Sequence, residues 1–199
     1  MKYFLVALFI VCGMSCARDT AYFLGMQNSR YAYVGVRPYA HWGVLYKNSV
    51  FEQNLELQYG RLAVFYIFSS TSNLSGECFF FGGMRFNGDY YDAGSELDVR
   101  FTLHPRYLVL RGVLQPRYDS EIGRMIGYSI SGQTKPLEEV GLRAGVKNLP
   151  EYRDVERRVF AGLVFESGHL KVEPEISMPF EMKLENTRVA ISFIYINLI

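Results

Sequence analysis

The stretch that decides the fold is residues 138–147, "EEVGLRAGVK", in which apolar and polar side chains alternate. Val140, Leu142, Ala144 and Val146 fall on one face of an extended chain, and charged residues or glycine fall on the other. A soluble sheet buries its apolar face in a core. A barrel in a bilayer turns that face outward to lipid and keeps the charges inside. The rest of the chain must decide between these two arrangements.

The same alternation recurs along most of the 199 residues and predicts an all-β, closed antiparallel up-and-down barrel. The clearest strand is "RVAISFIYINLI" (188–199), which would be an unprotected edge in a soluble sheet but pairs with the first strand in a barrel. Because Pro105 cannot donate to a ladder, 97–114 is either interrupted or one bulged strand, and we expect about ten strands within a range of 8–12. Further strands are expected at 30–37, 41–49, 54–59, 61–69, 77–86, 124–131, 157–166 and 169–177.

Residues 1–17, "MKYFLVALFIVCGMSCA", have the pattern of a secretory signal. Lys2 precedes an apolar run that is too short to span a bilayer, and Ser15-Cys16-Ala17 fits cleavage after Ala17. The alternative is lipoprotein processing at Cys16. The expected organisation is therefore a signal peptide (1–17), an N-terminal segment (18–29) and a single barrel domain (30–199).

The charge balance excludes some partners. Loss of Lys2 leaves 20 of the 21 basic residues against 20 acidic ones, so the mature chain is formally neutral. A neutral chain gives no basis for nucleic-acid binding. Cleavage after Ala17 also removes Cys12 and Cys16, which leaves Cys78 without a disulfide partner.

Charges of both signs fall on the faces that a membrane barrel would turn inward. Buried charges need partners, so we expect these side chains to pair across a narrow, largely filled interior. The role expected of such a barrel is non-enzymatic, either structural or through loop contacts with other envelope components, with no cofactor. The predicted interior network comprises Glu56, Asp98, Arg100, Arg111, Glu139, Arg143, Lys147, Lys171, Glu173 and Glu175.

Two other readings remain open. The first is a secreted soluble β-barrel or sandwich that binds a small apolar ligand. The second is a lipid-modifying enzyme, but His41 and Ser49 would lie about 27 Å apart along one strand at roughly 3.4 Å per residue. The histidines form no metal-ligand spacing, and Glu173 and Glu175 fit internal ion pairs better than catalysis.

The signal at 1–17, the amphipathic strands and the closing strand 188–199 make the chain resemble the small outer-membrane β-barrel proteins of Gram-negative bacteria. The resemblance is one of pattern and carries no family-specific motif. It implies a porin-like barrel in the outer membrane, monomeric and in contact with membrane lipid and lipopolysaccharide. The chain departs from that class at Ile199, where an aromatic residue is usual.

Overall fold

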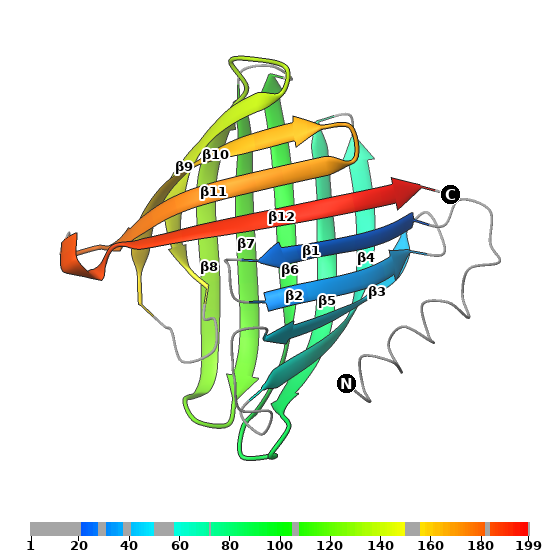
Figure 1. The fold of residues 1–199 in the computed structure, drawn as a ribbon, viewed down its shortest axis with the longest axis vertical. Helices are drawn as coiled ribbons and strands as arrows, with labels where there is room; N and C mark the ends of the chain where they lie inside the picture. Colours follow the sequence, from blue (N-terminus) through cyan, green and yellow to red (C-terminus); the bar gives the residue numbers. More distant parts are fainter. Residues whose placement is uncertain are drawn as a thin grey trace.

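The fold is a closed antiparallel barrel of twelve strands (Figure 1). The computed structural model describes residues 21–27, 31–37, 41–49, 58–71, 73–104, 108–149, 156–181 and 184–198. The barrel closes where β1 pairs with β12, with Ala21 opposite Leu198. The strands are β1 (Ala21–Gln27), β2 (Tyr31–Arg37), β3 (Trp42–Ser49), β4 (Tyr59–Thr71), β5 (Leu74–Arg85), β6 (Tyr91–His104), β7 (Leu108–Asp119), β8 (Gly123–Thr134), β9 (Val140–Asn148), β10 (Arg158–Ser167), β11 (Leu170–Pro179) and β12 (Arg188–Leu198); the 3-10 helix η2 (Leu184–Asn186) lies between the last two.

The all-β barrel is as predicted, but its strands number twelve instead of about ten. β6 ends at His104 and β7 begins at Leu108, so 97–114 is two strands and not one. The barrel also begins at Ala21, inside the segment expected to precede it. β1 is hard to recognise because Phe23 faces the interior, which weakens the apolar–polar alternation. The strand expected at 54–59 falls mostly outside the described residues.

β6 and β7 are longer than the sequence pattern predicted. Residues 88–95 and 115–123 are rich in polar side chains, proline and glycine, as connections often are, yet β6 starts at Tyr91 and β7 runs to Asp119. The polar residues responsible, Asp92 and Arg117 among them, are buried inside the barrel. Polarity here marks an inward-facing side chain and not a loop.

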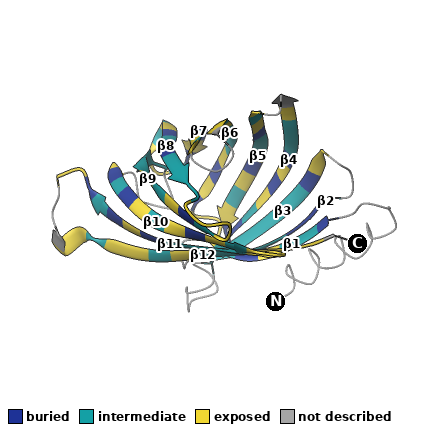
Figure 2. Cartoon of the chain, turned by 90° about the horizontal axis from the view of Figure 1, so that it is seen from above, coloured by how far each residue is buried: buried dark blue, intermediate teal, exposed yellow. Residues whose placement is uncertain are grey.

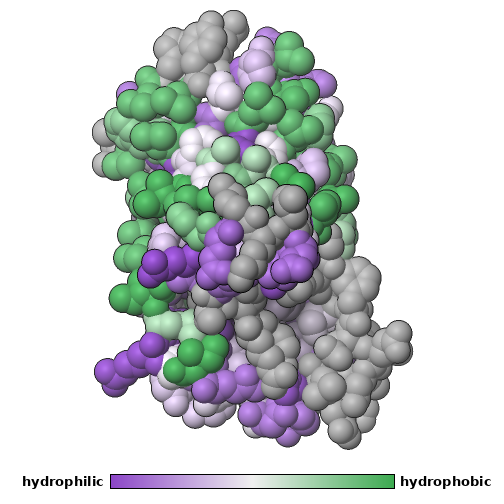
Figure 3. Space-filling model, turned by 90° about the vertical axis from the view of Figure 1, so that its left-hand side faces the viewer, coloured by the Kyte–Doolittle hydropathy of each residue, from purple (hydrophilic) through white to green (hydrophobic). Residues whose placement is uncertain are grey.

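Apolar side chains face outward, as a membrane barrel requires. Leu142 is 49% exposed and Leu170 43% exposed, whereas Arg143 and Glu173 line the interior. Bands of different burial alternate along the strands (Figure 2). Apolar groups cover much of the upper part of the face drawn in Figure 3, and hydrophilic groups gather lower down. This arrangement overturns the reading of a soluble protein with a dry core.

The two ends of the barrel differ. The end at which Ala21 meets Leu198, the terminal end, has the connections 38–41, 72–73, 105–107, 135–139 and 168–169, none longer than five residues. The opposite end, the loop end, has the three longest connections, 50–58, 149–157 and 180–187, together with the shorter 28–30, 86–90 and 120–122. Short turns beside the termini and long loops opposite them are typical of outer-membrane barrels.

Outward-facing aromatic residues gather at both ends. The rings of Trp42 and Tyr66 lie 4.9 Å apart at the terminal end, and those of Tyr91 and Tyr118 lie 6.1 Å apart at the loop end. Aromatic girdles of this kind sit at the two interfaces of a bilayer. Within the described ranges, no helix has both the length and the apolarity needed to cross a membrane.

Candidate functional site in the barrel lumen

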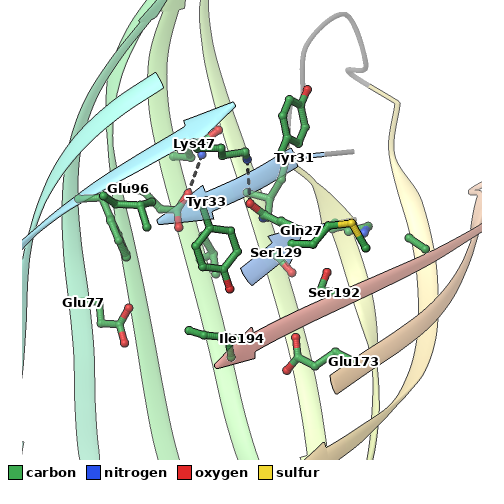
Figure 4. Close-up of a pocket in the computed structure, with 18 of the residues that line it drawn as sticks. Gln27, Tyr31, Tyr33, Lys47, Glu77, Glu96, Ser129, Glu173, Ser192 and Ile194 are labelled. Carbon is green, nitrogen blue, oxygen red and sulfur yellow. Dashed lines mark hydrogen bonds between the residues drawn. The ribbon is translucent and has the colours of Figure 1, made fainter. Parts of the chain in front are cut away.

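The barrel encloses a cavity of about 710 Å³ (Figure 4). Tyr33, Glu77, Glu96 and Glu173 point into it from four different strands. The interior is therefore not filled by its charged side chains, contrary to the prediction. Twelve strands make a wider barrel than ten, and the ion pairs join strands that are adjacent or one strand apart, so they lie along the wall.

One part of the predicted network assembles on β9 and β11. Arg143 lies 3.4 Å from Glu173 and 3.3 Å from Glu175. Glu175 also receives a hydrogen bond from Lys147, and Lys171 lies 2.9 Å from Glu173. The two carboxylates are thus held in ion pairs, which fits a structural role for them better than acid–base chemistry.

A second part assembles on β6 and β7. Arg111 donates to both carboxylate oxygens of Asp98, at 3.0 and 2.6 Å, and Asp98 is only 2% exposed. Arg100 lies 3.4 Å from Asp98 and 3.5 Å from Glu77. Together with the ion pairs on β9 and β11, these residues form the charged wall of the lumen.

Two predicted members are not placed in this wall. Glu139 is exposed in the connection before β9, one residue short of the strand, so its assignment to the interior differs from the structure. Glu56 lies outside the described residues.

The most deeply buried ion pairs lie at the loop end and were missed by the sequence reasoning. Arg117 pairs with Asp119 at 2.6 Å, and neither side chain is exposed. Tyr90 donates to the same carboxylate at 2.5 Å. Asp92 accepts from Arg61 at 2.5 Å and from Tyr59 at 2.6 Å. These six residues form the loop-end cluster: Tyr59, Arg61, Tyr90, Asp92, Arg117 and Asp119.

A signal for this cluster was present in the sequence. Arg117 and Asp119 continue the period of two that begins at Arg111, and Asp92 continues that of Asp98. Extending the inward face through these residues would have placed them in the barrel wall.

The side of the lumen formed by β1 to β5 carries a cluster of aromatic rings, beside the charged residues Lys47, Arg61 and Glu77. The ring of Phe65 lies 5.5 Å from that of Phe23 and 5.6 Å from that of Phe79. Leu45 and Ala63 also line the cavity here. We call this the aromatic wall; its members are Phe23, Tyr33, Leu45, Ala63, Phe65, Phe79 and Phe81.

Glycines on neighbouring strands make room for these rings. A Cβ at Gly35 would lie 2.1 Å from the Phe23 ring, and one at Gly25 would lie 2.4 Å from the Tyr33 ring. Each glycine is the direct cross-strand partner of the residue whose ring covers it. The rings therefore extend sideways along the wall, which leaves the centre of the lumen open.

His41 and His169 do not join the lumen. His41 is exposed at the terminal end, its ring 5.7 Å from Tyr66, and the His169 ring lies 6.2 Å from Tyr195 at the same end. Among the described residues, no group of three or more His, Cys, Asp or Glu side chains could hold a metal ion.

The chain matches no protein-family model and no curated protein. Among solved structures it is similar to the KdgM porin in complex with disordered oligogalacturonate, with a TM-score of 0.61 and 13% identity over 89% of this chain and 98% of that one. A second KdgM porin structure gives a TM-score of 0.59 and 14% identity over the same shares of the two chains. The NanC porin gives a TM-score of 0.49 and 9% identity, covering 90% of this chain and 99% of that chain.

The barrel, its apolar exterior and its charged interior together define a class of protein. The chain is a small, porin-like β-barrel of the outer membrane.

Proposed function

We propose that the chain is a narrow, passive, non-enzymatic channel through which small solutes cross the outer membrane. The observation that carries the proposal is the cavity of about 710 Å³ inside the barrel. Ion pairs hold the long side chains of the charged wall close to the strands, and the rings of the aromatic wall lie over glycines on neighbouring strands. The centre of the cavity therefore stays open.

The oligogalacturonate held by the KdgM porin is an acidic sugar chain. The present lumen does not favour a polyanion of that kind, because Arg111 and Arg143 are already matched by Asp98, Glu173 and Glu175. We therefore propose smaller solutes with at most one or two charges.

Single-channel recording in planar bilayers tests the proposal. Purified, refolded barrel should produce discrete and steady current steps that disappear when the protein is boiled before addition. Absence of steps from protein that still migrates as a folded barrel on an unboiled gel would contradict the channel and favour a structural role.

We also propose that the barrel acts as a monomer surrounded by membrane lipid, including lipopolysaccharide. Support comes from strands on different sides of the barrel that all expose apolar residues, such as Leu62, Ile130 and Val189. Exposed apolar side chains all around the described strands are what contact with lipid on every side requires. Cross-linking in intact membranes should give a single monomer band, and a ladder of oligomers would contradict this.

A further inference from the structure

The lipid-facing surface of the barrel carries a groove over β5 to β8, in the half nearer the loop end. Its floor lies between β6 and β7, where Ser95 and Pro116 form no pair although the ladder continues in the same register on both sides of them. Proline has no N–H to donate, so it cannot join the two strands there. We call this hollow the outer groove, and the lining side chains that define it are Phe80, Ala93, Ser95, Pro116, Arg124 and Ile126.

The floor of the outer groove is low and its sides are high. Phe80 is the cross-strand partner of Ser95, and Ile126 is that of Pro116. Phe80 is 61% exposed and Ile126 64% exposed, so both stand out from the strands that flank the floor. Beside the floor, a Cβ at Gly82 would come within 4 Å of a single atom outside its chain neighbours, at 3.9 Å. In a bilayer an apolar chain fills such a hollow, because an empty space forfeits the dispersion contacts of its walls.

A positive charge borders the outer groove on the side of the loop end. Arg124 is exposed on β8, where it is the cross-strand partner of Tyr118 and lies two residues before Ile126. Within the described parts of β5 to β8, it is the one charged side chain at an outward-facing position. Arg124 forms no ion pair with any residue that the structure describes, including Glu121 in the adjoining turn. It is therefore available to an anion from outside the chain.

The position of Arg124 suits the phosphate of a lipid headgroup. The rings of Tyr91 and Tyr118, 6.1 Å apart, belong to the aromatic girdle that marks the bilayer interface at this end. A guanidinium matches the geometry of a phosphate with two parallel hydrogen bonds. Ile126 follows Arg124 at roughly 7 Å toward the bilayer centre, at about 3.4 Å per residue. A lipid whose phosphate meets Arg124 would thus lay an acyl chain along the groove.

We infer that the outer groove binds one phosphorylated lipid of the outer leaflet, lipopolysaccharide. Its phosphate meets Arg124, and one acyl chain lies between Phe80 and Ile126. The long connections at this end assign it to the outer face of the membrane, where lipopolysaccharide supplies the lipid. The inference deepens the proposed contact with lipopolysaccharide and rests on it, but it does not depend on whether the barrel conducts.

The test is native mass spectrometry of the full barrel, released from detergent after titration with lipid A, the phosphorylated and acylated anchor of lipopolysaccharide. The unaltered barrel should give one saturable adduct. Arg124→Gln should weaken binding by about tenfold or more, the contribution of hydrogen bonds to a charged group. Lipid A stripped of its phosphates should bind the unaltered barrel as weakly, and Arg124→Gln should lower that residual binding little further.

Arg157→Gln is the matched control for the charge, because Arg157 is also an exposed arginine at the loop end but precedes β10, away from the groove. It should bind lipid A as the unaltered barrel does. The groove itself is tested by Ala93→Leu, which raises the floor and should weaken binding by about two- to fivefold through lost dispersion contacts. Ala144→Leu, at an exposed alanine on β9, should have no effect. The heat-dependent gel shift checks that each variant is folded.

An unchanged affinity of Arg124→Gln or of Ala93→Leu would overturn the inference, as would equal binding of the dephosphorylated lipid. Displacement of lipid A by inorganic phosphate at millimolar concentration would show a simple anion site and overturn it too. A series of adducts that does not saturate and is alike in all variants would overturn the site and leave the general lipid contact standing. Absence of any adduct would count against both.

Discussion

The ring of Phe65 occupies the space above Gly43, its cross-strand partner, so that a Cβ on Gly43 would fall 2.2 Å from the ring. The same Cβ would lie 2.7 Å from the carbonyl oxygen of Val36. The width of the lumen on this side therefore depends on a residue without a side chain.

Gly43→Ala should narrow the channel. The added methyl group displaces the Phe65 ring toward the centre and strains the backbone, at a cost of about 1–3 kcal/mol typical of overpacking. Single-channel conductance should fall. Adding Phe65→Ala to the same chain should restore the conductance.

The control for this substitution is Gly112→Ala, also within a strand, where a Cβ would have no atom within 4 Å. Its conductance should match that of the unaltered barrel. An equal loss of conductance in both glycine variants would show that the ring of Phe65 is not responsible.

Asp119→Ala should destabilise the loop end. Asp119 accepts from Arg117 and Tyr90, and also from the backbone N–H groups of Glu121 and Ile122 at 2.9 and 3.2 Å. Its loss leaves the Arg117 guanidinium buried without this partner, a change that costs about 3–5 kcal/mol in soluble proteins. Thermal unfolding in detergent, read from the heat-dependent gel shift, should occur at a clearly lower temperature.

Glu138→Ala is the control for Asp119→Ala, because Glu138 is an exposed acid in the connection between β8 and β9. It should leave the unfolding temperature unchanged. If the two variants unfold at the same temperature, the buried ion pair is not a major source of stability.

Ile130→Arg should weaken the barrel in lipid. Ile130 is 63% exposed within β8, and an arginine on the lipid face near the bilayer midplane costs about 2–4 kcal/mol. Leu137→Arg serves as its control, since Leu137 is 64% exposed but lies in a connection outside the strands. Denaturant unfolding from lipid vesicles should give a lower free energy of unfolding for Ile130→Arg than for Leu137→Arg. A soluble protein would tolerate both substitutions alike.

Arg143→Ala should make the channel more selective for cations. Removing this guanidinium leaves Glu173 and Glu175 with less compensating charge in the charged wall. The reversal potential in a potassium chloride gradient should shift toward the potassium potential, whereas Arg143→Lys should shift it less. A reversal potential unchanged by Arg143→Ala would place this ion pair away from the path of the ions.

The sequence by itself determined the barrel and its inverted surface. Alternation with period two sets which side chains share a face, and 138–147 and 188–199 carry that pattern over long stretches. It also placed Arg143, Glu173 and Glu175 on inward faces, because charges cannot face hydrocarbon without partners. Its failures fall where alternation is weak, as in β1, or where polar inward residues resemble a loop, as at Asp92.

Only the tertiary structure decided the strand number, the partner of each charge and the open lumen. Register brings Gly43 opposite Phe65 and Asp98 close to Arg111, and neither relationship can be read from one strand alone. Closure pairs β1 with β12 and so fixes the circumference of the barrel. The physical reason is that alternation is a local property of the extended chain, whereas cavity width and ion pairing depend on residues far apart in sequence that meet only after the barrel closes.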